Sequence, residues 1–265
     1  MASPSRVQVR RETGEGGGVA FITLNDERRL NALGSEIMKQ FVDALTSLRD
    51  NARLRYVVVT GAGDRAFVAG ADVDELADIT SPAEARVFIN KVHACCDAVR
   101  AFPTPVIARI NGVALGAGLE LAISCDLRVA TDTATFGMPE VKLGIPSVVE
   151  AALLPGLIGW GRAREMLLLG STINAKAALA MGLVEAVVPA DELDAAVETR
   201  IRALFDVRPQ AVRLQKALMR RWGNLPTREA ILAGVDAFSE AFLTPEPGLA
   251  TDTWRTERAR RKVRP

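Results

Sequence analysis

NGVALGAGLELAISCD, residues 111–126, is the stretch around which the rest of the chain is organised. The apolar segment before it, residues 105–110, has the composition of a buried strand, and its small residues predict a turn into a short helix. Glu120 lies within an apolar run, where a carboxylate loses water and therefore needs a partner, a raised pKa or a chemical task. Gly116 and Gly118 let another group approach the backbone where a helix has unpaired N–H groups. We interpret this stretch as the floor of an active site.

The composition of the whole chain is that of an ordinary globular protein. Of its 265 residues, 49% are hydrophobic and 25% are charged, with a formal net charge of +1. This balance argues against a main role on nucleic acids or membrane surfaces, and we interpret the basic end RTERARRKVRP as a solvated tail. Neither a signal peptide nor a membrane-spanning run is recognisable, so we expect a cytoplasmic protein of one large domain or two small ones.

Cysteine and histidine are too scarce for a disulfide framework or an obvious zinc site. There are three cysteines, two of them adjacent at Cys95 and Cys96, and His93 is the single histidine. The cysteines are typical of small core residues, and His93 is interpreted as an ordinary packing or surface residue. We therefore expect no metal site.

The pattern of elements predicts a repeated strand–strand–helix unit rather than strict strand–helix alternation. Strands are expected at residues 19–24, 56–60, 67–72, 105–110 and 126–131, with a helix opening near Ser35. Ser81, Pro82 and Glu84 form the clearest helix start in the chain. From Asp191 onward the pattern is helical throughout. We expect a core over residues 1–200 and a helical oligomerisation region over residues 201–265.

Two familiar kinds of site are disfavoured by their context. VVVTGAGDRA, residues 57–66, has the outline of a dinucleotide-binding turn, but further extended chain follows where a phosphate-binding helix should begin. A nucleophilic site is equally poorly supported, because there is no GxSxG motif and no serine near His93 in the sequence.

Glu120 and Glu140 remain as candidates for chemistry, because both lie in glycine-flanked, apolar surroundings. Two carboxylates in one dry pocket cannot both ionise easily, so one would be held protonated and the pair would supply an acid and a base. The alternative is that Glu120 pairs with an arginine such as Arg128 while Glu140 caps a turn. The residues alone leave both alternatives open.

Five segments resemble, in the right order, the motifs of the enoyl-CoA hydratase/isomerase (crotonase) superfamily. They are NDERRLNALGSEI (residues 25–37), AFVAGADVDEL (66–76), NGVALGAGLEL (111–121), FGMPEVKLGIP (136–146) and LAMGLVEAVVP (179–189). The resemblance implies an α/β fold, a crotonase-like ββα spiral core with a C-terminal helical region that trimerises. It also implies a homotrimer or a dimer of trimers, that is, a homohexamer.

The resemblance assigns roles to individual positions. The backbone N–H groups of Ala69 and Ala117 would form an oxyanion hole for the thioester oxygen, worth roughly 3–4 kcal/mol per donor. Glu140 would protonate the α-carbon and Glu120 would orient and activate water. No separate cofactor is implied, since coenzyme A enters as part of the substrate. Its expected binding residues are Arg29, Leu30, Ala32, Ala71, Asp72, Val73 and Gly116.

One segment departs from the family pattern. Where hydratases carry an I-P-G-x-G-G-T segment, this chain has IPSVVEAALLP, with Val148, Val149 and an additional acid, Glu150. We expect these residues to narrow or reshape the acyl pocket. Glu150 would either add a third carboxylate to the site or simply begin the next helix, where acids are favoured.

The function that follows from the resemblance is that of a lyase of fatty acid metabolism, a 2-enoyl-CoA hydratase acting through an enolate. Within the family, the alternatives are an isomerase, dehydratase, thioester hydrolase or decarboxylase on another acyl-CoA. Both glutamates favour hydration or dehydration, because isomerisation can work with one carboxylate. A non-catalytic or RNA-binding homologue is disfavoured by the near-neutral charge.

Overall fold

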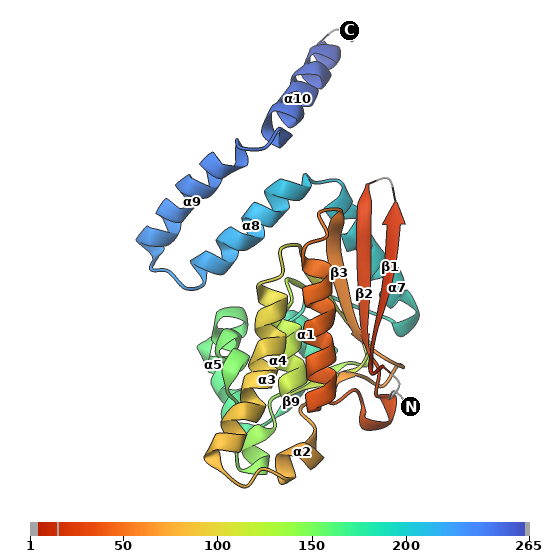
Figure 1. Ribbon diagram of the computed structural model, residues 1–265, viewed down its shortest axis with the longest axis vertical. Coiled ribbons are helices and arrows are strands. Elements are labelled where there is room, and N and C mark those ends of the chain that lie inside the picture. The colour runs from red at the N-terminus through yellow and green to blue at the C-terminus, as the bar shows by residue number, and fades with distance from the viewer. Residues whose placement is uncertain (1–4, 15, 263–265) are drawn as a thin grey trace. The chain divides into compact units, whose positions relative to one another are not determined.

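The computed structural model describes residues 5–14 and 16–262. Between Arg202 and Ala203 the chain divides into two compact units. The first contains two β-sheets with their helices, and the second is helical (Figure 1). None of the helices in the described residues combines the length and apolar composition that a membrane crossing requires.

The larger sheet has six strands. In spatial order they are β1 (Val7–Gly14), β2 (Gly17–Leu24), β3 (Leu54–Gly61), β5 (Val106–Ile110), β7 (Leu127–Thr131) and β10 (Ala186–Val188). β1 and β2 form an antiparallel hairpin, and the remaining neighbours are parallel. β3 and β5 are almost entirely buried, as expected for parallel strands with both faces covered.

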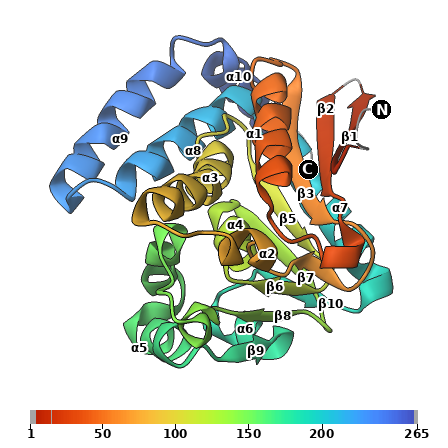
Figure 2. The ribbon, with the colours of Figure 1, turned by 60° about the horizontal axis from the view of Figure 1, so that its bottom comes forward.

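The smaller sheet has four short strands. In spatial order they are β4 (Ala66–Val68), β6 (Val113–Leu115), β8 (Thr135–Gly137) and β9 (Thr172–Asn174). β3 and β4, β5 and β6, and β7 and β8 are consecutive pairs whose first strand joins the larger sheet and whose second joins the smaller one (Figure 2). The predicted strand–strand–helix repeat and the mixed α/β class are confirmed.

The helix α3 (Pro82–Arg100) packs against several other elements of the first unit. It packs against α1 (Ser35–Arg49), α4 (Ala117–Ser124) and η3 (Val149–Leu153), and α1 and α3 lie side by side in Figures 1 and 2. Its predicted start is confirmed, because Ser81 Oγ accepts the backbone N–H of Glu84 at 3.3 Å and Pro82 opens the first turn.

The remaining helices complete both units. The first unit also contains η1 (Glu27–Arg29), α2 (Val73–Ala77), η2 (Glu140–Leu143), α5 (Leu154–Leu169), α6 (Ala175–Met181) and η4 (Ala190–Glu192). α7 (Leu193–Phe205) crosses the division, and the second unit holds α8 (Pro209–Trp222), α9 (Thr227–Ala241) and α10 (Glu246–Lys262).

Three strands were not among those expected from the sequence. β1 was not predicted, because all its residues after Val7 are exposed and it has no alternating apolar face. β8 and β9 were not predicted either, because each has only three residues and shows no clear strand pattern. The basic end continues the helical pattern expected after Asp191, because α10 extends to Lys262, and its described side chains at Arg255, Thr256 and Arg258 are exposed to solvent; residues 263–265 lie outside the described chain.

Two buried asparagines fix the segment between β3 and β4. Asn111 Nδ2 donates to the carbonyl groups of Gly61, Gly63 and Ala66 at 2.8–3.1 Å, and Asn31 Nδ2 also donates to Ala66, at 2.8 Å. The segment with the outline of a dinucleotide-binding turn therefore leads into strand β4 instead of a helix.

Candidate active site

A cavity of about 120 Å³ lies at the start of α4 within the first unit. Its wall is formed by the segment after β4, by α2 and α3, by the first turn of α4 and by the segment around η2. Of the eleven site residues expected from the sequence, seven line it, namely Ala69, Ala71, Val73, Gly116, Ala117, Glu120 and Glu140. The structure thus brings segments far apart in the sequence to one small, mostly apolar space.

The two glycines at the start of α4, Gly116 before the helix and Gly118 in its first turn, are required by close approaches. Gly116 precedes the helix with a φ of +50°, and a Cβ there would lie 2.3 Å from Oε1 of Glu140. A Cβ on Gly118 would lie 2.0 Å from the backbone oxygen of Val68 in β4. Because there is no room for these atoms, the glycines let β4 and Glu140 approach the helix.

Glu120 is held in the protonated form by its surroundings. The residue is only 3% exposed, and its Oε1 accepts the backbone N–H of Ala151 at 3.1 Å. Burial raises the pKa of Glu120 to about 8, with the charges of Glu140 and Glu150 acting in the same direction and the Ala151 hydrogen bond opposing them. At neutral pH this carboxyl group therefore carries a proton.

The alternative in which Glu120 pairs with Arg128 is wrong. Arg128 is buried, but its guanidinium donates to the carboxylate of Glu185 and to the carbonyl oxygens of Leu183 and Cys125, at 2.9 and 2.7 Å for the carbonyls. The backbone N–H of Arg128 donates to Glu185 as well, at 2.5 Å. Arg128 thus belongs to a separate ion pair.

Glu140 faces the same cavity from the opposite segment. It is the first residue of η2, and its Oε2 accepts a hydrogen bond from Ser147 Oγ at 2.8 Å. Its Oε1 lies above Gly116, as the space around that glycine indicates. The predicted pair of carboxyl groups is therefore brought together, with one oxygen of each held by a neighbouring donor.

The two backbone amides expected to bind the thioester oxygen differ in their present partners. Ala117 is the first residue of α4, so its N–H has no acceptor inside the helix, and the described residues offer it none elsewhere. The N–H of Ala69 donates to the carbonyl oxygen of Leu30 at 3.1 Å. Both residues line the cavity, and their joint role as an oxyanion hole stays a prediction.

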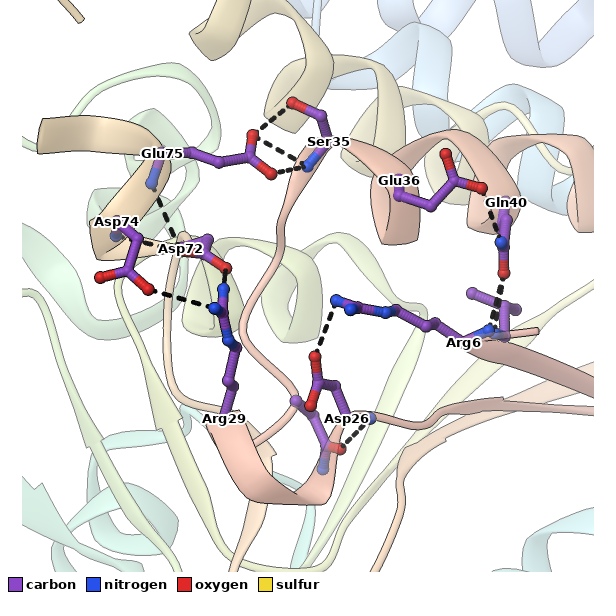
Figure 3. A network of polar contacts seen from close by, with 11 residues as sticks. Arg6, Asp26, Arg29, Ser35, Glu36, Gln40, Asp72, Asp74 and Glu75 are labelled. Atoms are coloured by element: carbon purple, nitrogen blue, oxygen red, sulfur yellow. Dashed lines mark hydrogen bonds and ion pairs between the residues drawn. The ribbon is translucent and has the colours of Figure 1, made fainter. Parts of the chain in front are cut away.

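The loop expected to bind coenzyme A runs beside the cavity without lining it. Arg29, Leu30, Ala32 and Asp72 are absent from the wall. Arg29 forms ion pairs with Asp72 at 2.5 Å and with Asp74 at 3.2 Å, and these three side chains converge in Figure 3. Although burial opposes the effect, Arg29 and two backbone N–H groups hold the pKa of Asp72 below its usual value. The charge of Arg29 is therefore already partly balanced.

A second, apolar cavity of about 690 Å³ adjoins the first one. The two share wall residues from α2, from α3 and from the segment 143–148, including Val148. Val148 thus faces the space that it was expected to reshape, whereas Val149 packs against the hydrophobic core. The volume lies within the range of small-molecule sites.

Four contacts of the site could not be predicted from the sequence. Ser147 holds Glu140, and the amide of Ala151 holds Glu120. Glu150 lies in the first turn of η3, as expected, but it is also buried and pairs with His93 and Arg100. The interpretation of His93 as an ordinary residue missed this pairing. No three histidine, cysteine or acidic side chains within residues 5–14 and 16–262 gather where they could hold a metal ion.

The pKa of Glu120 predicts how stability depends on pH. The folded protein retains a proton up to about pH 8 that the unfolded chain releases near 4.5, so stability falls as pH rises through this interval. Replacing Glu120 by Gln removes this loss of stability at high pH, because Gln does not titrate. We expect the melting temperature of Glu120→Gln, relative to the unaltered protein, to increase from pH 5 to pH 9. The full effect on the free energy of unfolding is on the order of a few kcal/mol.

Thermal unfolding followed by circular dichroism measures this difference. Glu165→Gln is the matched control, because Glu165 is exposed. Parallel pH profiles for Glu120→Gln and the unaltered protein would contradict the assigned protonation state.

Comparisons with known proteins agree with this geometry. The sequence profile of the family described as enoyl-CoA hydratase/isomerase matches residues 14–248. A probable enoyl-CoA hydratase of Mycobacterium tuberculosis is 37% identical over 229 residues, which cover 86% of this chain and 88% of that protein. The crotonyl-CoA hydratase of Syntrophomonas wolfei is 36% identical over the same length, with the same coverage of 86% and 88%.

Solved structures show the same relationship. The crystal structure of enoyl-CoA hydratase from Bacillus anthracis has a TM-score of 0.89 and 31% identity, covering 96% of this chain and 97% of that one. A structure of enoyl-CoA hydratase from Geobacillus kaustophilus has a TM-score of 0.88 and 33% identity, covering 96% of each chain. From its sequence, its fold and the arrangement of its site, this chain belongs to the enoyl-CoA hydratase/isomerase family, the crotonase superfamily.

Proposed function

We propose that this enzyme adds water across the 2,3 double bond of a 2-enoyl-CoA thioester. The observation that carries the proposal is that Glu120 and Glu140 meet in one apolar cavity, where Glu120 keeps a proton at neutral pH. A carboxyl group that holds a proton beside a second carboxylate supplies the acid and the base that hydration needs. Relatives named crotonyl-CoA hydratase and short-chain-enoyl-CoA hydratase support the same reaction.

The two carboxyl groups share one proton through the reaction. Glu120 takes a proton from water as the water oxygen bonds to the β-carbon, and the electrons of the double bond move to the thioester oxygen. The resulting enolate then takes a proton from Glu140 at its α-carbon. The product state has its proton on Glu120, which is the resting state that burial favours. The next addition begins after the bound water has carried that proton to Glu140.

The reverse reaction starts directly from the resting state. Protonated Glu120 can give its proton to the departing β-hydroxyl group, while Glu140 removes the α-proton. The same site therefore accounts for dehydration of a 3-hydroxyacyl-CoA. Both directions use the same two residues, as microscopic reversibility requires.

The enolate oxygen needs donors that are already in place. The unpaired N–H of Ala117 at the start of α4 is the first of them, and the helix dipole favours negative charge there. The N–H of Ala69 is the second, and the substrate oxygen must share it with Leu30 or displace that carbonyl group. Each donor contributes roughly 3–4 kcal/mol to the stability of the transition state.

The coenzyme A part lies along the loop that contains Arg29, Leu30 and Ala32, and along the segment from Ala71 to Val73. Because Asp72 and Asp74 already partly balance the charge of Arg29, backbone groups carry most of this recognition. No separate cofactor takes part in the proposed reaction. The adjoining apolar cavity of about 690 Å³ receives the acyl chain, so uncharged chains longer than a crotonyl group are expected to fit.

Turnover of enoyl-CoA substrates tests the proposed reaction. We expect the unaltered protein to consume crotonyl-CoA or a longer 2-enoyl-CoA, followed by loss of the enoyl-thioester absorbance. Mass spectrometry should show a product heavier by one water molecule, whereas isomerisation leaves the mass unchanged. Glu120→Gln and Glu140→Gln should each lower kcat about 10²–10⁴-fold, because each removes a proton-transfer group.

The pH profile of kcat/KM adds a second constraint. It should fall as the pH rises past about 8, where the free enzyme loses the shared proton. Glu165→Gln serves as the control with unchanged turnover. A protein that binds coenzyme A but consumes no enoyl-CoA of any chain length would disprove the hydratase proposal and leave the family assignment intact.

The space above Gly116 predicts a separate effect on activity. Gly116→Ala should displace the Glu140 carboxylate, since the new Cβ would meet its Oε1, and kcat should fall at least tenfold. Gly159→Ala is the matched control, because Gly159 also has a positive φ but nothing within 4 Å of an added Cβ. Steady-state kinetics of the two variants measures the difference. Equal losses in both variants would assign the effect to backbone strain and refute the crowding argument.

We further propose that the second unit assembles the protein into a trimer or a dimer of trimers. Ile231, Val235, Phe238 and Phe242 follow helical spacing in and directly after α9, and each is more than 60% exposed. An exposed apolar row of this kind marks a protein interface. Sedimentation equilibrium should give three or six times 28.4 kDa, and the double variant Val235→Glu, Phe238→Glu should dissociate. A concentration-independent monomer would exclude this assembly.

A further inference from the structure

A third acidic side chain is buried behind the cavity. Glu150 is only 3% exposed, and its Oε1 lies 2.9 Å from Nδ1 of His93 and 3.6 Å from Nη1 of Arg100. Both partners belong to α3. Its Oε2 is buried and has no hydrogen-bond partner among the described residues. A carboxylate with a purely structural task would be expected to satisfy both oxygens, because an unpaired buried oxygen is costly.

The backbone next to Glu150 has an unusual conformation. Val149 has a φ of +42°, a conformation that is strongly disfavoured for a β-branched residue. The next residue after Glu150 is Ala151, whose N–H donates to Oε1 of Glu120. Glu150 therefore joins α3, through His93 and Arg100, to the amide that holds the catalytic carboxyl group.

The charge of Glu150 also acts on its neighbours. Burial is the main cause of the raised pKa of Glu120, and the charges of Glu140 and Glu150 raise it further. Burial is also the main cause of the raised pKa of the Cys96 thiol, and the charge of Glu150 again acts in the same direction. The groups that face Glu150 are thus His93, Cys96 and Arg100 on α3 and Glu120 on α4. His93 is half exposed and connects this buried charge to solvent.

We propose that Glu150 is a positioning residue for the proposed reaction, which acts through Glu120 in two ways. Its contacts with α3 anchor the Ala151 amide that orients Glu120, and its negative charge helps to keep the proton on that group. The inference rests on the proposed function, in which Glu120 holds the proton that the reaction uses. It assigns a task to Glu150, the acid that this chain carries where it departs from the glycine-rich family pattern.

Two conservative variants separate the two effects. Glu150→Gln keeps the size of the side chain and an acceptor for His93 but removes the charge. The fall of kcat/KM at high pH should then move to lower pH, because the remaining causes raise the pKa of Glu120 less without this charge. Glu150→Asp keeps the charge but shortens the anchor. Its kcat should fall at least tenfold with KM little changed, and the position of the high-pH fall should be retained.

Glu185→Gln is the matched control, because Glu185 also pairs with an arginine, but outside the cavity. It should change stability and leave the pH profile in place. If neither Glu150 variant that folds changes kcat or the pH profile, the proposal is overturned, and Glu150 has only a structural role.

A measurement independent of turnover distinguishes a failure of the role assigned to Glu150 from a failure of the hydratase proposal. The pH dependence of thermal stability is measured for four proteins, namely the unaltered protein, Glu120→Gln, Glu150→Gln and the double variant. The effect of Glu120→Gln is thereby obtained once with Glu150 present and once with Glu150 replaced. If Glu150 acts on Glu120, the stability difference caused by Glu120→Gln levels off at a lower pH, and is smaller at pH 9, when Glu150 is replaced. An unchanged difference overturns the electrostatic part of the inference, whether or not the enzyme hydrates enoyl-CoA.

Discussion

The exclusion of water from the Glu120 carboxyl group is the constraint on which the site depends. α4 is buried along its whole length, so Glu120 cannot be hydrated as a surface glutamate would be. A single backbone N–H from Ala151 does not offset that loss, and the neighbouring acids Glu140 and Glu150 add to it. The group therefore keeps its proton at neutral pH. This state costs stability, as is common at functional sites, and in the proposed reaction it provides the proton that the two acids share.

The fold produces this setting by bringing short segments into contact from both sheets. Each consecutive strand pair places one strand in the larger sheet and one in the smaller, and the segments that follow β4, β6 and β8 line one cavity. Gly116 and Gly118 allow contacts that any side chain would prevent. Asn31 and Asn111 hold the connection between β3 and β4 through its carbonyl groups. These hydrogen bonds fix the start of β4, whose Val68 packs against α4 at Gly118.

Much of the fold could be predicted from the sequence, because its signals are local. The apolar strands, the capped start of α3 and the repeated strand pairs follow from periodicity and turn residues. β1 could not be predicted, since its exposed residues show no apolar face and only its pairing with β2 defines it. Glu120 could be singled out because it interrupts an apolar run, but its partner could not. Arg128 was a reasonable candidate, yet the donor is the amide of Ala151, 31 residues away. The pairing of His93 with Glu150, 57 residues apart, likewise leaves no local signal.

The central claim is that the free protein carries a proton on Glu120 at neutral pH, and infrared spectroscopy of the carboxyl groups tests it most directly. The account predicts a stretching band of a protonated, buried carboxyl group at pH 6–7 that disappears as the pH is raised past about 8. The same band should be missing in Glu120→Gln. A spectrum without such a band at pH 6–7, or an identical band in the variant, would contradict the account.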